Sequence, residues 1–217
     1  MCKQSMFYLA QVDFKRVINF QNFNTPNMPS VTENDFTAAV DNVLARLPGI
    51  DRLYPSQEEV LRLLVKGENI FVTSPTNSGK SLAPIILPSI LLELTKVGYE
   101  FPPDSKTLFV TQLNSIQLSL LSSMSSLGIK CGGVTSDNVK ELLVSDVQVL
   151  LVGPEVLKQP NVTKMLLCFR TSFVCKVVDE AHLGKNCNTV IRSLLLGRVN
   201  SEYFRFRLIP LSGLESP

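Results

Sequence analysis

The sequence contains a single histidine, and its five cysteines include no C-x-x-C pair. One histidine excludes a histidine-rich metal site, and an odd number of scattered cysteines favours reduced core thiols over a zinc site or a disulfide framework. Charged residues are also scarce, at 18% of the chain against about 25% in typical globular domains, whereas hydrophobic residues reach 45%. This balance argues against a disordered chain and predicts a well-filled core.

The glycine and proline content and the net charge exclude further classes of protein. Glycine occurs 11 times and proline 13 times in 217 residues, which excludes collagen-like and low-complexity chains. The formal net charge of +2 lacks the excess of a strongly basic nucleic-acid binder, although backbone amides can also hold phosphates. The uncharged stretch 107–129 holds several glutamines and serines, so we expect a strand and an amphipathic helix there and no membrane partner.

The hydrophobic pattern predicts helices first and then an alternation of strands and helices. Ser30 and Glu33 have the spacing of a capping box, and helices are predicted over 30–47 and 56–66. Strands are then predicted at 69–73, 106–111, 130–134, 147–152, 173–178 and 204–211, with helices beginning at 81, 113 and 138 between them. This alternation predicts an α/β fold with a mostly parallel sheet and helices on both faces. We expect residues 1–32 to form an N-terminal extension and linker, and residues 33–217 to form the main domain.

One segment between a predicted strand and a predicted helix has the context of a phosphate-binding loop. It consists of Ser74, Pro75, Thr76, Asn77, Ser78, Gly79, Lys80 and Ser81. Backbone N–H groups of such a loop and the helix N-terminus point at phosphates. Lys80 would then reach the β- and γ-phosphates, and the Ser81 hydroxyl would hold Mg²⁺. Ser74 replaces the first glycine of the general G-x-x-x-x-G-K-S pattern, so an ordinary strand–turn–helix corner stays open as an alternative.

A second segment, Val177-Val178-Asp179-Glu180-Ala181-His182, ends a predicted buried strand with two carboxylates. Ligands bind at the carboxyl ends of strands in open α/β sheets. Asp179 would bind the Mg²⁺ of a nucleotide through water, and Glu180 would orient or deprotonate the attacking water. The alternative is an exposed acidic strand end.

Taken together, Asp-Glu-Ala-His and Pro-Thr-x-x-Gly-Lys-Ser resemble the superfamily 2 (DEAD/DEAH-type) helicases, and within them the RecQ-like group. Pro55-Ser56-Gln57 matches the Pro-x-Gln that precedes the phosphate loop in RecQ-type proteins. Three further segments resemble their motifs: 74–82, 111–116 and 154–157. The resemblance runs from about Phe36 to the end of the chain and implies a RecA-like P-loop fold, the first motor lobe of an ATP-dependent DNA helicase or translocase.

The resemblance also implies roles for individual residues. Gln57 would bind the adenine edge, since its amide offers a donor and an acceptor. His182 would couple the nucleotide state to the nucleic acid. The nucleic-acid path would be lined by Gln112, Leu113, Asn114, Ser115, Gly153, Pro154 and Glu155. The implied cofactors are ATP and Mg²⁺.

The implied partners are single-stranded or partly duplex DNA, with RNA as the less favoured substrate, and a second RecA-like lobe in cis or in trans. No targeting segment is evident at the N-terminus. The expected localisation is intracellular, and nuclear if the source is a eukaryote.

The sequence also departs from the RecQ pattern. Asn77 and Ser78 replace two glycines of the loop, residues 183–189 contain no aromatic side chain, and only Ser212 remains of the Ser/Thr-Ala-Thr motif. In the family, a second lobe supplies the arginine finger. We therefore expect ATP hydrolysis by this chain alone to be slow. Two alternatives stay open: a catalytically degenerate nucleotide- or nucleic-acid-binding module, and a fragment of a DEAD-box-like RNA helicase.

Overall fold

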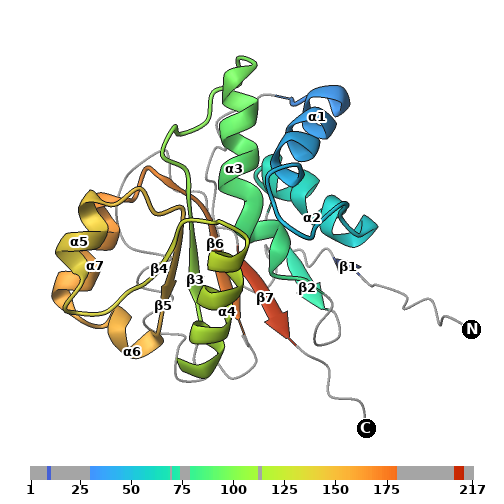
Figure 1. The fold of residues 1–217 in the computed structure, drawn as a ribbon. Helices are drawn as coiled ribbons and strands as arrows, with labels where there is room; N and C mark the ends of the chain where they lie inside the picture. The colour runs from blue at the N-terminus through green and yellow to red at the C-terminus, as the bar shows by residue number, and fades with distance from the viewer. Residues whose placement is uncertain are drawn as a thin grey trace, which may run out of the picture.

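The computed structural model describes residues 9–10, 30–68, 70–73, 79–111, 114–179 and 208–212. Within these residues the strands form one seven-stranded sheet in the order β1-β2-β7-β6-β3-β5-β4 (Figure 1). The strands are β1 (Leu9–Ala10), β2 (Phe71–Thr73), β3 (Lys106–Val110), β4 (Cys131–Gly133), β5 (Val149–Val152), β6 (Phe173–Asp179) and β7 (Leu208–Ser212). The helices are α1 (Glu33–Leu44), α2 (Pro55–Val65), α3 (Leu82–Lys96), α4 (Asn114–Ser126), α5 (Val139–Val144), α6 (Pro154–Leu157) and α7 (Pro160–Cys168).

The sheet is parallel except at β1, which pairs antiparallel with β2. Helices cover both of its faces: α1 to α4 pack on one face and α5 to α7 on the other. The predicted α/β fold with a mostly parallel sheet is therefore confirmed. The ends of strands β2 to β7 lie within four residues of the predicted ranges.

Strand β5 is an uninterrupted apolar run because both of its faces are covered. In β5, Val149 and Leu151 contribute to the core under α1 to α4. Leu150 and Val152 contribute to the core under α5 to α7. Successive side chains of a strand point to opposite faces, so a strand buried on both sides shows no alternation with polar residues.

The start of α1 differs from the prediction. The N-cap is Thr32, whose Oγ1 accepts a hydrogen bond from the Asp35 backbone N–H at 3.2 Å, so the predicted capping box at Ser30 is wrong. A tertiary contact with Tyr99 favours Thr32 over Ser30 as the N-cap. The Tyr99 hydroxyl accepts from the Thr32 N–H at 3.0 Å and donates to Asp35 Oδ2 at 2.7 Å. Tyr99 follows α3, so the sequence around Ser30 could not reveal this partner.

The two helices between β5 and β6 were not predicted from the sequence. Both α6 and α7 begin with proline at the first helical position, where the missing N–H costs no hydrogen bond. The buried residues of α7, Val162, Met165 and Leu166, recur at helical spacing. These two signals together would have identified α7.

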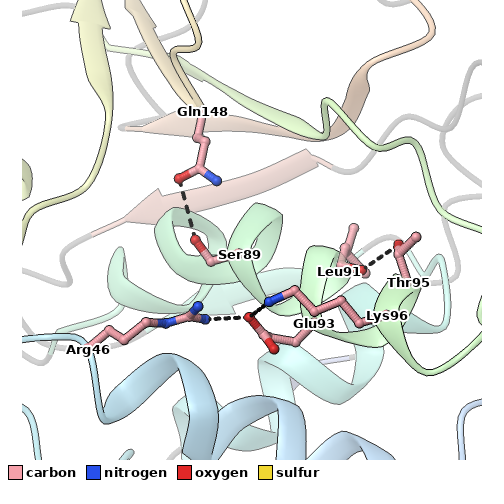
Figure 2. A network of polar contacts seen from close by, with 7 residues as sticks. All are labelled: Arg46, Ser89, Leu91, Glu93, Thr95, Lys96 and Gln148. Carbon is pink, nitrogen blue, oxygen red and sulfur yellow. Dashed lines mark hydrogen bonds and ion pairs between the residues drawn. The ribbon is translucent and has the colours of Figure 1, made fainter.

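A buried carboxylate joins the turn after α1 to α3. Glu93 of α3 is 8% exposed, and its Oε1 lies 2.7 Å from both Arg46 Nη2 and Lys96 Nζ (Figure 2). Figure 2 also shows Ser89 of the same helix reaching Gln148, which precedes β5, at 3.4 Å. Hydrogen bonds from Lys96 and from Arg46 outweigh burial and hold the pKa of Glu93 below its ordinary value of 4.5. The α1–α2 layer is thus attached to the helix that follows the predicted phosphate loop.

Replacing Glu93 with glutamine should destabilise the fold in a pH-dependent way. A lost charged hydrogen bond is worth about 1.5–3 kcal/mol, or about 3–12 °C in melting temperature for a domain of this size. Because the folded-state pKa is lowered, the stabilisation is present above pH 4.5 and is lost as the pH falls through the folded-state pKa. Melting curves of wild type and Glu93→Gln should differ at pH 7 and converge in acid. A constant difference at all pH values would contradict the assignment, and Glu59→Gln on the exposed face of α2 is the control.

None of the helices in the described ranges combines the length and the apolar character needed to cross a membrane.

Candidate functional site

The carboxyl ends of the parallel strands bring the two predicted motifs to one edge of the sheet. Val72 of β2 pairs with Leu211 of β7, and Leu211 pairs with Asp179 of β6. Neighbouring strands lie about 4.8 Å apart, so the backbone of Asp179 lies about 10 Å from the end of β2. The strand that leads into the predicted phosphate loop and the strand that ends in Asp179 are therefore separated only by β7. Ser212, the remnant of the weakened motif, ends that intervening strand.

The end of the phosphate loop is shaped around a glycine. Gly79 has φ of +71°, in the left-handed region, and a Cβ there would lie 2.6 Å from Gln57 Nε2. The left-handed backbone favours glycine at this position, and a methyl group there would have to displace the amide of Gln57. Lys80 is half-buried, and Ser81 is the N-cap of α3. The Ser81 side chain makes no capping hydrogen bond, so its hydroxyl is not used to begin the helix.

Gln57 connects α2 to this loop. Its side chain is 5% exposed, its Oε1 accepts from the Tyr54 N–H at 2.9 Å, and its Nε2 donates to the Gly79 carbonyl at 2.9 Å. A buried amide needs such partners, and each of its two polar atoms can still form one more hydrogen bond. The remaining N–H and lone pair are the groups that an adenine edge requires. Sequence reasoning missed the bond to Gly79, because nothing in the pattern indicates a contact across 22 positions.

The residues at the start of α3 are better suited to bind a phosphate group than to form a metal site. Gly79, Lys80 and Ser81 bring a close backbone approach, an ammonium group and a hydroxyl to the start of a 15-residue helix. The positive end of the helix dipole favours an anion there. Ser81 and Asp179 stay the predicted Mg²⁺ ligands. Within the described ranges, no group of three or more histidine, cysteine, aspartate or glutamate residues could hold a metal ion.

The structure brings the two predicted nucleic-acid segments to neighbouring strand ends. Asn114 and Ser115 open α4, directly beyond β3. Gly153, Pro154 and Glu155 lie at the start of α6, directly beyond β5, the strand that pairs with β3. A residue absent from the sequence prediction lies between them: Gln117 of α4 donates to the Thr111 carbonyl at 3.1 Å.

Several predicted site residues lie outside the described ranges. They are Ser74, Pro75, Thr76, Asn77, Ser78, Gln112, Leu113, Glu180 and His182. Asp179 is placed as the last residue of β6. The roles predicted for these residues stay predictions.

The chain is similar to known proteins over most of its length. A family model described as DEAD/DEAH box helicase matches residues 54–195. The chain is 32% identical over 143 residues to the ATP-dependent DNA helicase Hel308 of Caldivirga maquilingensis, covering 62% of this chain and 17% of that protein. It is 28% identical over 160 residues to the uncharacterized ATP-dependent helicase YprA of Bacillus subtilis, covering 67% of this chain and 21% of that protein. The chain thus spans about a fifth of the length of these relatives.

The fold also matches a solved structure. A crystal structure of a hypothetical ATP-dependent RNA helicase from Sulfolobus tokodaii superposes with a TM-score of 0.53 at 19% identity. The match covers 86% of this chain and 52% of that one. At this identity it supports the RecA-like fold alone.

Proposed function

We propose, from the premise that the chain belongs to the DEAD/DEAH box helicase family, that it is the ATP-binding lobe of a helicase or translocase. In this proposal it binds Mg-ATP and couples hydrolysis to movement along nucleic acid. The observation that carries the proposal is the hydrogen bond from Gln57 to Gly79. It joins the residue proposed to recognise the base to the loop proposed to hold the phosphates, so both act as parts of one nucleotide site.

The roles within that site follow from the chemistry of each group. Lys80 would supply positive charge to the β- and γ-phosphates, and Ser81 and, through water, Asp179 would hold Mg²⁺. Glu180 orients the attacking water, and His182 transmits the nucleotide state to the nucleic acid. The bound Mg²⁺ neutralises phosphate charge. A second RecA-like lobe, in cis or in trans, closes the site and contributes an arginine finger, which is worth about 10³ to 10⁵ in rate.

Adenine should be preferred over guanine. After bonding Tyr54 and Gly79, Gln57 retains one N–H and one lone pair, which match the adenine N7 acceptor and 6-amino donor. Guanine O6 would reverse one of these bonds, at a cost of about 1–3 kcal/mol, which corresponds to about 5- to 150-fold in affinity. Competition of ATP and GTP for a fluorescent ATP analogue measures the ratio. Equal affinities would show that Gln57 does not read the base.

The nucleic acid is proposed to be single-stranded or partly duplex DNA. The RecQ-like motifs support this choice, as does the similarity to a protein named as a DNA helicase. The runner-up is RNA, in keeping with the name of the structural neighbour. Contacts from 112–115 and 153–155 would come from backbone N–H groups and small polar side chains. Few phosphates would then be neutralised, so binding should depend only weakly on salt.

ATP hydrolysis measured with and without single-stranded DNA or RNA tests the function. Slow hydrolysis that either polymer accelerates supports the motor lobe. The second candidate, a catalytically degenerate module, is favoured by Asn77 and Ser78 in place of loop glycines. It predicts nucleotide binding with no hydrolysis, even in the presence of nucleic acid. The absence of both binding and hydrolysis would contradict either function.

A further inference from the structure

The parallel ladder between β3 and β5 ends at a position where the backbone offers no further donor. Thr111 follows β3, and its N–H donates to the Val152 carbonyl at 3.2 Å. In a parallel ladder, the Thr111 carbonyl would next accept from the N–H of residue 154. That residue is Pro154, which has no N–H. Thr111 is 1% exposed, so its carbonyl needs a donor from another part of the chain.

Gln117 supplies this donor from α4. Its Nε2 lies 3.1 Å from the Thr111 carbonyl oxygen. The same amide nitrogen lies against the end of β5, since a Cβ built on Gly153 would be 3.4 Å from it. Gly153 has φ of −79° and ψ of 149°, a conformation open to any residue. The Gln117 side chain is therefore hydrogen-bonded to one strand end and lies close to the other.

The other end of α4 is anchored separately. A Cβ on Gly133 of β4 would lie 3.2 Å from Leu121 Cδ1, and Met124 is 1% exposed in the core. These apolar contacts fix the helix on the sheet without Gln117. The amide of Gln117 therefore acts on the local arrangement of the strand ends rather than on the attachment of the helix.

We propose that Gln117 is a positioning residue for nucleic-acid binding: it fixes the spacing between the start of α4, at residues 114–115, and residues 153–155 beyond β5. The inference rests on the proposed function, in which these segments contact the nucleic-acid backbone. Backbone N–H groups and short polar side chains cannot extend to follow a displaced phosphate. Affinity therefore depends on how the two segments are spaced.

Two variants of Gln117 test this role. Gln117→Glu keeps the shape but replaces the donor with an acceptor that repels the Thr111 carbonyl, and Gln117→Met keeps the length without any polar atom. Ser122→Ala, on the exposed side of the same helix, is the matched control. Affinity for fluorescein-labelled oligo-dT and oligo-U is measured by fluorescence anisotropy, and affinity for Mg-ATP by calorimetry. Both Gln117 variants should bind the oligonucleotides about 10-fold more weakly, with Mg-ATP affinity unchanged and the control like wild type.

The affinities for oligonucleotides and for Mg-ATP distinguish a positioning role of Gln117 from an effect on overall stability. A purely structural role would lower the melting temperature and leave the oligonucleotide affinity of the folded variants unchanged, which would overturn the inference. If Gln117→Glu does not fold, the oligonucleotide affinity of Gln117→Met tests the inference. Failure of the wild-type chain to bind either oligonucleotide would contradict the proposed function itself. Binding by wild type that both variants retain would contradict only the role of Gln117.

Discussion

Replacing Lys80 with alanine should weaken Mg-ATP binding by about 10- to 100-fold. Lys80 lies between Gly79 and the first turn of α3, at the helix N-terminus where the proposed phosphate site is located. A charged hydrogen bond contributes about 1.5–3 kcal/mol, and removing the ammonium group leaves phosphate charge without its side-chain cation. Isothermal titration calorimetry with Mg-ATP measures the loss.

The control is Lys66→Ala, which removes an exposed lysine after α2 and should leave the affinity unchanged. Equal affinities of wild type and Lys80→Ala would contradict the phosphate-binding assignment. The loop would then be an ordinary corner between a strand and a helix.

Gly79→Ala should abolish measurable nucleotide binding, whereas Gly49→Ala should not. Both glycines have φ above +70°, so both substitutions incur the left-handed strain of about 1–2 kcal/mol. A Cβ at Gly49 would meet nothing within 4 Å, but one at Gly79 would lie 2.6 Å from Gln57 Nε2. The methyl group at Gly79 must therefore displace Gln57 or the loop, and either movement separates the proposed base and phosphate sites.

The pair of variants isolates this clash from backbone strain. Both should melt at a lower temperature than wild type, Gly79→Ala by the larger amount because the clash adds to the backbone strain, and only Gly79→Ala should lose nucleotide affinity in calorimetry. Equal nucleotide affinity of the two variants would mean that the contact between Gln57 and Gly79 does not support the site.

The order of strands and helices could be predicted because it depends on local patterns. Apolar runs such as 149–152 and the loop that ends in Gly79-Lys80-Ser81 are visible in any short window of the sequence. What could not be predicted depends on partners remote in the chain. The hydrogen bond between Tyr99 and Thr32 favours Thr32 as the N-cap of α1, and the Gly79 carbonyl accepts a hydrogen bond from the Gln57 amide.

The missed role of Gln117 has the same origin. Its partner, Thr111, lies only six positions away, but the need for that partner arises from Pro154 on a different strand. The spacing of residues within α4 does not indicate that the Thr111 carbonyl needs a donor. The missing donor becomes visible only when the register of β3 and β5 is known.

Hydrogen–deuterium exchange with and without Mg-ATP tests the central claim most directly. If Gln57 and the phosphate loop form one nucleotide site, Mg-ATP should protect the amides at the start of α2, around 54–58, together with those at 79–83. The turn around Gly49, where an added Cβ would meet nothing within 4 Å, serves as the internal reference. Simultaneous protection of both segments is the predicted result, and protection of neither, or of 79–83 without 54–58, would contradict it.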